Sequence, residues 1–139
     1  MIGLGTLRRV AGEVRRDIKA ASERDPAAKG VSPAEILAAW PGVHALLSHR
    51  VAHALRGAGV PIAPRVLAYF SRSLTGIEIH PCAQIGDGLF IDHGMGVVIG
   101  ETDHLPKRTR RRSRGSPIGA ARPRAGTRAS RGRTAGTRR

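Results

Sequence analysis

Residues 77–102 read IEIHPCAQIGDGLFIDHGMGVVIGET, and this stretch decides the fold. Aliphatic side chains recur in it every six residues, at Ile79, Ile85, Ile91 and Val97. An α-helix repeats about every 3.6 residues and a strand every two, so neither explains this spacing. A six-residue repeat is typical of a parallel β-helix, in which each hexapeptide forms one face of a triangular coil and its aliphatic residue points inward. The stretch therefore predicts the first coil of a parallel β-helix.

The six-residue pattern ends at Thr102. The next position of the pattern, 103, holds Asp, and position 109 holds Thr. Four hexapeptides form little more than one triangular coil, whereas solenoids need about three stacked units before each covers its neighbour. We therefore expect an incomplete β-helix over residues 76–102 that is poorly stable by itself.

The residues before the repeat predict an N-terminal helical domain over residues 1–75. Its first helix ends near Asp25, before a proline, and its apolar residues fall at helical spacing: Leu7, Val10, Val14, Ile18 and Ala21. A second, short helix starts after Ser32, because serine is a preferred N-cap, a proline follows it, and Glu35 lies three residues on.

Two further helices complete this domain. Pro41 suits the first turn of the third helix, which Gly57 or Gly59 ends. The fourth runs from about Pro64 to Leu74, before the break at Thr75 and Gly76.

Positive charge is concentrated at the end of the sequence. Residues 107–139 hold 13 of the 24 Lys and Arg residues and no Asp or Glu, so most of the formal net charge of +14 belongs to them. Their Gly, Pro, Ser and Arg content predicts disorder, which we extend over residues 103–139. Such a segment favours salt-dependent binding to nucleic acid phosphates, and without an aromatic residue for base stacking that binding would be non-specific.

The remaining composition bears on the compartment. Cys82 is the only cysteine, which favours a reducing environment and excludes an intrachain disulfide. The sequence shows neither a signal-peptide pattern nor a run of about 20 apolar residues. We therefore expect a cytoplasmic protein with no membrane partner.

Five motifs, in this order, resemble bacterial serine acetyltransferases. They are RDP from Arg24, PG-x-HA from Pro41, H-R-x-A-H from His49, IHP from Ile79 and F-I-DHG-x-G-x-V-I-GET from Phe90. The resemblance covers about residues 7–102, and the ordered set is far more specific than the hexapeptide pattern alone. It implies a left-handed parallel β-helix and the transfer of acetyl from acetyl-CoA to the hydroxyl of L-serine, which gives O-acetylserine for cysteine biosynthesis.

The resemblance implies four site residues. His93 matches the general base that removes the serine hydroxyl proton, a task for which a neutral imidazole is suited. Glu78 matches its acidic partner, and if three hexapeptides make one coil, the fifteen residues between the two return the chain near the same corner. Asp25 and Asp92 match carboxylates that contact the substrate serine, although a helix end and a polar corner remain simpler interpretations of these two. We expect no metal, and acetyl-CoA as co-substrate rather than as a bound cofactor.

Other candidate residues have simpler interpretations. His49 and His53 are spaced to share a helix face as metal ligands, but no third ligand is evident, so a packed or solvated face is favoured. His80 is interpreted as a corner residue, Cys82 as a small apolar filler and Trp40 as a residue packed between helices.

The sequence departs from the family after Thr102. The resemblance implies further coils with an Arg-His pair, most of the acetyl-CoA groove, and a tail that docks into O-acetylserine sulfhydrylase; none is identified here. One choice of codons for residues 103–112, read one base later, gives a segment similar to the family's continuation. We therefore interpret residues 103–139 as out of frame and the chain as a truncated acetyltransferase of impaired activity. The family assembles as homotrimers or hexamers, and the alternative function is the non-catalytic nucleic acid binding described above.

Overall fold

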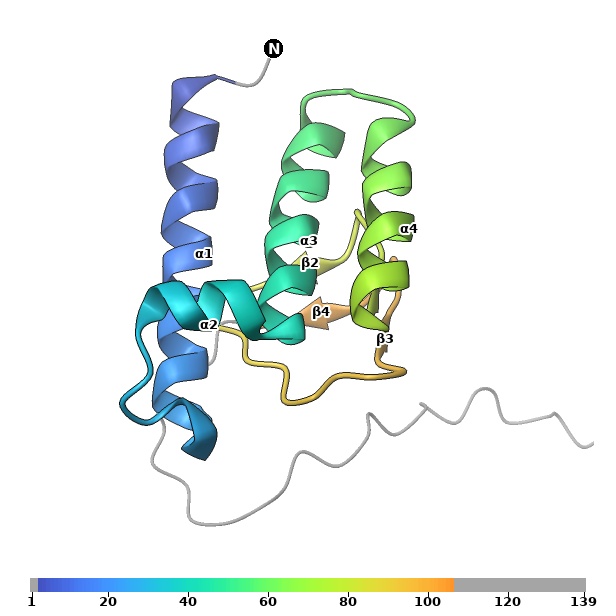
Figure 1. Cartoon of the computed structure of the whole chain (residues 1–139). Helices are drawn as coiled ribbons and strands as arrows, with labels where there is room; N and C mark the ends of the chain where they lie inside the picture. Colours follow the sequence, from blue (N-terminus) through green and yellow to red (C-terminus); the bar gives the residue numbers. More distant parts are fainter. Residues whose placement is uncertain (1–2, 107–139) are drawn as a thin grey trace, which may run out of the picture.

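The computed structural model describes residues 3–106. The helices are α1 (Leu4–Arg24), α2 (Pro33–Ala39), α3 (Pro41–Gly57) and α4 (Ala63–Thr75), with a short 3-10 turn at Pro26–Ala28. Four two-residue strands follow: β1 (Glu78–Ile79), β2 (Gln84–Ile85), β3 (Val98–Ile99) and β4 (His104–Leu105). Figure 1 shows α1, α3 and α4 side by side, with α2 crossing in front of α1 toward the lower end of α3 and the strands behind α3 and α4. The predicted helical domain is confirmed.

Local sequence signals set the helix ends. The Ser32 hydroxyl accepts a hydrogen bond from the Glu35 backbone N–H at 3.2 Å, as expected of an N-cap. Pro41 stands at the first turn of α3, and Gly57 is its last residue. Gly76 ends α4 with a φ of 71°, a left-handed conformation that glycine adopts without steric cost. The predictions for all four helices are confirmed to within a residue or two.

Replacing Ser32 with alanine is expected to lower the free energy of unfolding by about 1 kcal/mol, since the first turn of α2 loses its side-chain acceptor. Urea denaturation measures this loss. Ser73→Ala is the matched control, because the Ser73 hydroxyl only donates back to the Tyr69 carbonyl, at 3.1 Å, within α4. Its effect is expected to stay below about 0.5 kcal/mol. Equal losses in the two variants would contradict the capping role.

The strands pair in parallel from one coil to the next. Glu78 lies opposite Val98 and Ile79 opposite Ile99, so β1 pairs with β3. In the same way β2 pairs with β4, with Ile85 opposite Leu105. A coil of three hexapeptides would instead place Glu78 opposite position 96. One coil of this chain is therefore two residues longer than the pattern predicts.

Two expectations are wrong for this reason. The counterpart of Ile79 in the next coil is Ile99 rather than Val97, and the position after it is Leu105 rather than 103. The pattern therefore continues past Thr102, and the structured region extends at least to Pro106. β2 follows β1, and β4 follows β3, at the predicted spacing of six residues. The two additional residues of the coil therefore lie between β2 and β3.

Two hydrophobic clusters hold the elements together. The first joins α3 to the strands and contains Ala45, Leu46, Ile77, Ile79, Ala83 and Ile99, with Ile85, Leu89, Ile91, Val97 and Leu105 packed against it. All four aliphatic residues of the six-residue pattern belong to this set, so their predicted inward orientation is confirmed. The second cluster joins α1, α2 and α3 and contains Ala21, Ala28, Ile36 and Val43, with Ile18, Val31, Trp40 and Phe90 against it. Phe90 thereby ties the segment before Asp92 to the helical domain.

Several predictions concern residues 107–139, which lie outside the described part of the chain. They are the disorder of this segment, its out-of-frame origin and its binding to nucleic acid. The disorder predicted for residues 103–106 is wrong, because these residues contain β4. Within residues 3–106, none of the helices combines the length and the apolar character that crossing a membrane requires.

Candidate active site

His93 occupies a strained turn at the molecular surface. Its φ of 54° is the only positive value of a non-glycine residue among those described. The Gly94 N–H donates to the Asp92 carbonyl at 2.6 Å across this turn, and the His93 side chain is 96% exposed. A positive φ is uncommon outside glycine, and such strained residues cluster at functional sites. The backbone therefore presents the imidazole to solvent, where a substrate can reach it.

Asp92 lies beside this imidazole. Its Oδ1 is 3.6 Å from Nε2 of His93, which is longer than a hydrogen bond. The two side chains form an ion pair only when the imidazole is protonated, and both are largely exposed. Asp92 therefore lies next to the exposed imidazole without a hydrogen bond to it.

The Asp25 carboxylate is fixed by two donors. The Trp40 indole N–H donates to Oδ2 at 2.7 Å, and the Ala27 backbone N–H donates to Oδ1 at 2.8 Å. The Trp40 hydrogen bond above all, and then that of Ala27, lower the pKa of Asp25, and the nearby His93 adds to this effect. The structure thus places an ionised carboxylate near the exposed imidazole, and Trp40 holds it there. Sequence reasoning assigned Trp40 to packing alone and missed this contact.

Glu78 contacts a helix rather than His93 in this chain. Its Oε2 lies 3.0 Å from Nη1 of Arg72, and no hydrogen bond or ion pair among residues 3–106 joins Glu78 to His93. The expected return to the same corner assumed a coil of three hexapeptides. That assumption is wrong, because one coil runs from Glu78 to its opposite residue Val98. The role of Glu78 as the partner of His93 stays a prediction.

A buried carboxylate on α1 holds the segment that leads to His93. Asp17 is 2% exposed, and its Oδ1 accepts hydrogen bonds from the backbone N–H groups of Gly88 at 2.8 Å and Leu89 at 3.1 Å. Arg50 of α3, 4% exposed, donates from Nε to the Asp17 Oδ2 at 3.1 Å. Burial raises the pKa of the Asp17 carboxyl, and the Arg50 charge and the two amide donors oppose this rise.

Arg50 extends this network to the end of β2. It donates to the carbonyl oxygens of Ile85 and Gly86, the latter at 2.8 Å, and Arg24 donates to the Gly88 carbonyl at 3.0 Å. Three helical side chains therefore fix the backbone of residues 85–89 at several points. A charged residue within the apolar stripe of α3 was the sequence signal for this role of Arg50.

The two histidines of the H-R-x-A-H motif hold the corner after β1. The His53 Nδ1 lies 2.9 Å from the Pro81 carbonyl oxygen, and the buried His49 packs against His53, with the two ring centroids 5.6 Å apart. Neither belongs to a group of metal-ligating side chains within the described residues. The interpretation of these histidines as a packed helix face agrees with these contacts, and the motif as a whole fastens α3 to the first coil.

Burial of His49 predicts a loss of stability in acid. Burial, and then the Arg50 charge, lower the pKa of His49 to about 3, against an ordinary value of 6.5. Between these values the unfolded state binds a proton that the folded state does not, so stability falls as pH decreases, by at most about 1.4 kcal/mol per pH unit. Urea denaturation at pH 7, 6 and 5 measures this slope.

Two substitutions isolate the contribution of His49. His49→Gln is expected to reduce the acid slope, whatever its effect on stability at pH 7. His104→Gln is the control, because His104 is an exposed histidine on β4. An identical slope in the wild type and His49→Gln would contradict the assignment.

Two glycines also position the turn at His93, because the absence of a side chain lets their neighbours pack closely. A Cβ atom on Gly42, near the start of α3, would collide with the Ile91 carbonyl oxygen, and one on Gly94 would collide with Ile77. Glycine is therefore required where the helix approaches the residue before Asp92. This explains the glycine of the PG-x-HA motif.

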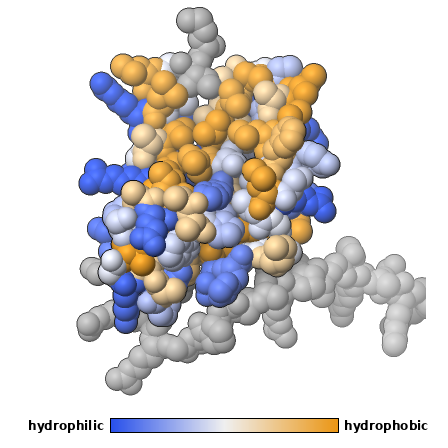
Figure 2. Space-filling model, in the orientation of Figure 1, coloured by the Kyte–Doolittle hydropathy of each residue, from blue (hydrophilic) through white to orange (hydrophobic). Residues whose placement is uncertain are grey.

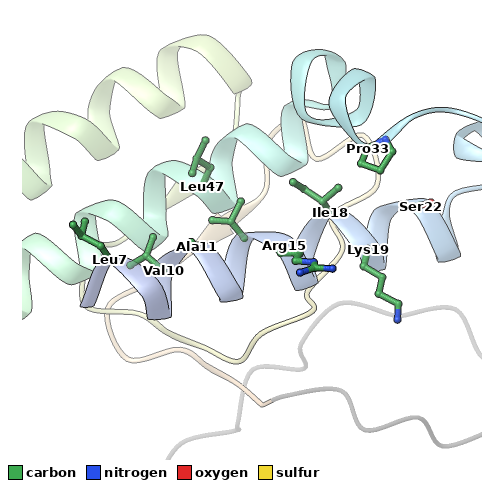
Figure 3. A pocket seen from close by; sticks show the side chains of 10 residues that line it. Leu7, Val10, Ala11, Arg15, Ile18, Lys19, Ser22, Pro33 and Leu47 are labelled. Carbon is green, nitrogen blue, oxygen red and sulfur yellow. The ribbon is translucent and has the colours of Figure 1, made fainter. Parts of the chain in front are cut away.

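An apolar groove lies away from the predicted site residues. Figure 3 shows it between α1, α3 and the start of α2, with a volume of about 540 Å³. Its lining comprises Leu7, Val10, Ala11, Val14, Arg15, Ile18, Lys19, Ser22, Pro33 and Leu47. Apolar side chains also gather on the face seen in Figure 2. None of the four predicted site residues lines the groove.

Comparison with known proteins supports the motif-based resemblance. No profile of a protein family matches the sequence. A serine acetyltransferase of Synechococcus elongatus is 56% identical over 86 residues, which are 62% of this chain and 34% of that protein.

Solved structures agree. Serine acetyltransferase isoform 3 of Entamoeba histolytica, in complex with cysteine, superposes with a TM-score of 0.68 at 44% identity, over 73% of this chain and 36% of that one. A serine acetyltransferase in complex with CoA superposes with a TM-score of 0.66 at 31% identity, over 70% and 41% of the two chains. The chain spans only 34–41% of the length of the curated relatives that it matches.

Proposed function

We propose that this chain, a homologue of serine acetyltransferases over its described part, contributes the helical region and the first catalytic residues of a serine O-acetyltransferase. The reaction transfers acetyl from acetyl-CoA to the hydroxyl of L-serine and yields O-acetylserine for cysteine biosynthesis. The observation that carries the proposal is the exposed imidazole of His93, with the Asp92 carboxylate beside it and Asp25 near enough to interact with it electrostatically. These residues come from the end of α1 and from the turn between β2 and β3, and only the folded chain unites them.

His93 acts as the general base in this proposal. Its neutral imidazole removes the proton of the serine hydroxyl while the oxygen attacks the thioester carbonyl carbon. The C–S bond then breaks, and the imidazolium returns its proton to the departing CoA sulfur. The exposure of the side chain and its fixed turn support this role.

The carboxylates bind the substrate and support the base. Asp25, kept ionised by Trp40, is suited to the serine ammonium group, and Asp92 is suited to the same group or to the imidazolium. Glu78 remains the proposed acidic partner of His93 on the strength of its motif. Its carboxylate has to leave Arg72 to take that role.

The proposal includes the oligomeric assembly and the cellular compartment of the complete enzyme. The strands continue as a left-handed parallel β-helix in the complete enzyme, which forms a homotrimer or hexamer in the cytoplasm. The apolar groove of Figure 3 and the exposed apolar residues of α4, which include Val66, Tyr69, Phe70 and Leu74, support burial of these faces against other chains. Acetyl-CoA enters as a co-substrate.

A chimeric enzyme tests the proposed function. The 86 aligned residues of this chain replace their counterparts in the Synechococcus elongatus serine acetyltransferase, which supplies the part of the relative that this chain does not match. We expect CoA release from acetyl-CoA that depends on L-serine. Size-exclusion chromatography verifies that the chimera assembles as its parent does. A correctly assembled chimera without serine-dependent CoA release would contradict the proposal.

A further inference from the structure

His80, Cys82 and Glu101 meet at one corner of the coil. Each offers one potential metal-ligating atom, and these atoms all lie within 4.8 Å of one another. The parallel register explains their proximity. Ile79 lies opposite Ile99, so the corner after β1, which carries His80 and Cys82, stacks on the corner after β3, which carries Glu101.

Within the described part of the chain, the side chains of Cys82 and Glu101 have no competing partner. Neither the Cys82 thiol nor the Glu101 carboxylate takes part in a hydrogen bond or an ion pair within residues 3–106. The Nδ1 of His80 accepts one hydrogen bond, from the Cys82 backbone N–H, at 3.2 Å. A cation at Nδ1 takes the lone pair that accepts this hydrogen bond, and a cation at Nε2 leaves the proton on Nδ1, so binding at either nitrogen ends it. The exchange costs one long hydrogen bond and gains a coordinate bond.

We propose that His80, Cys82 and Glu101 bind one Zn²⁺ ion, with water at the fourth position. Zinc accepts thiolate, imidazole and carboxylate ligands at about 2.0–2.3 Å in tetrahedral geometry, whereas Mg²⁺ and Ca²⁺ prefer oxygen ligands alone. A thiolate and a carboxylate also neutralise the charge of the dication. Small movements of these corner side chains, of which His80 and Cys82 are half-buried and Glu101 is exposed, bring the three ligand atoms to these distances.

The ion would fasten two consecutive coils to each other. Each strand pair here contains only two residues per strand, so the backbone hydrogen bonds between coils are few. A metal bridge between the corners after β1 and β3 adds a link that depends on the folded register, and metal binding then stabilises that register. The proposal concerns stability and does not depend on the proposed acetyltransferase function.

Cobalt titration of the full 139-residue chain tests the proposal. Co²⁺ replaces Zn²⁺ and gives a sulfur-to-metal charge-transfer absorption when a thiolate binds it. Because Cys82 is the only cysteine, this absorption reports on one residue. We expect the band to saturate at one equivalent of Co²⁺, to disappear on addition of Zn²⁺, and to be absent from both Cys82→Ser and Cys82→Ala.

Further variants identify the other two ligands. Loss of an outer hydrogen-bond partner already weakens metal binding by about 10- to 100-fold, so His80→Gln and Glu101→Gln are expected to weaken it at least tenfold. His104→Gln, at an exposed histidine of β4, is the control and should keep the wild-type affinity. Circular dichroism verifies that each variant folds. Slower alkylation of Cys82 in the presence of Zn²⁺ would support the proposal independently.

Three results would overturn the proposal. The first is the absence of a charge-transfer band at saturating Co²⁺. The second is equal affinity in Cys82→Ser and the wild type, since the histidines elsewhere would then account for binding. The third is unchanged affinity in a folded Glu101→Gln variant, because the site would then not join the two coils.

Discussion

Replacing His93 with alanine in the chimeric enzyme is expected to lower serine-dependent CoA release by about 10²- to 10⁴-fold, the usual contribution of a general base. Without the imidazole, the serine hydroxyl has to lose its proton to water as it attacks the thioester. The side chain is 96% exposed and packs against little, so its removal should leave the fold intact. Steady-state measurement of kcat and of kcat/KM for L-serine determines the effect.

A neighbouring substitution provides the control for this result. Met95→Ala alters an exposed side chain in the same turn, 81% exposed, that carries no acid or base. It is expected to change kcat by less than about threefold, an effect below about 1 kcal/mol. Retention of most activity in His93→Ala would show that another group removes the proton.

Replacing Arg50 with methionine is expected to lower the free energy of unfolding by about 3–5 kcal/mol. Methionine keeps much of the aliphatic volume but leaves the Asp17 carboxylate buried without its counter-ion. The carbonyl oxygens of Ile85 and Gly86 lose their donor at the same time. Because small domains are stable by about 5–15 kcal/mol, the loss is a large part of the total, and urea denaturation of the chain measures it.

Two further variants separate the buried pair from a general effect of lost charge. Lys19→Met breaks the exposed ion pair between Lys19 and Glu23, 3.8 Å apart, and is expected to cost less than about 1 kcal/mol. Combining Arg50→Met with Asp17→Leu is expected to recover part of the loss, because the double change removes both buried charges together. If Arg50→Met costs no more than Lys19→Met, the buried pair does not stabilise the fold.

Local signals were sufficient to predict the helices. Ser32, Pro41 and Gly76 act on the backbone within a few residues of themselves, so their effects can be read from neighbouring positions. The aliphatic positions of the coil were predicted for the same reason, because a six-residue period is a local property. The length of one coil was not, since it depends on which distant strands pair, here β1 with β3.

The residues of the candidate site show the same difference between local sequence signals and contacts of distant segments. His93, Asp92 and Asp25 were identified through sequence motifs, and the structure places them near one another. The Asp17–Arg50 network was missed because its partners lie 33 residues apart, and Asp17 bonds to backbone that is farther still along the chain, at Gly88. The cluster of His80, Cys82 and Glu101 also exists only through the register of the strands. Contacts of this kind depend on the pairing of distant segments, which composition and spacing do not specify.

The two additional residues between β2 and β3 belong to the turn at His93 and not to the stacked strands. They lie in the segment that carries His93, while the strands on either side keep their six-residue steps. Deleting two residues from this segment would restore a coil of three hexapeptides, keep the aliphatic side chains in phase and remove the room for the turn. A related chain with this shorter coil would therefore retain the architecture without a projecting histidine. Once the strand pairing is known, the length of a coil thus indicates whether it has room for a turn that projects from the stack.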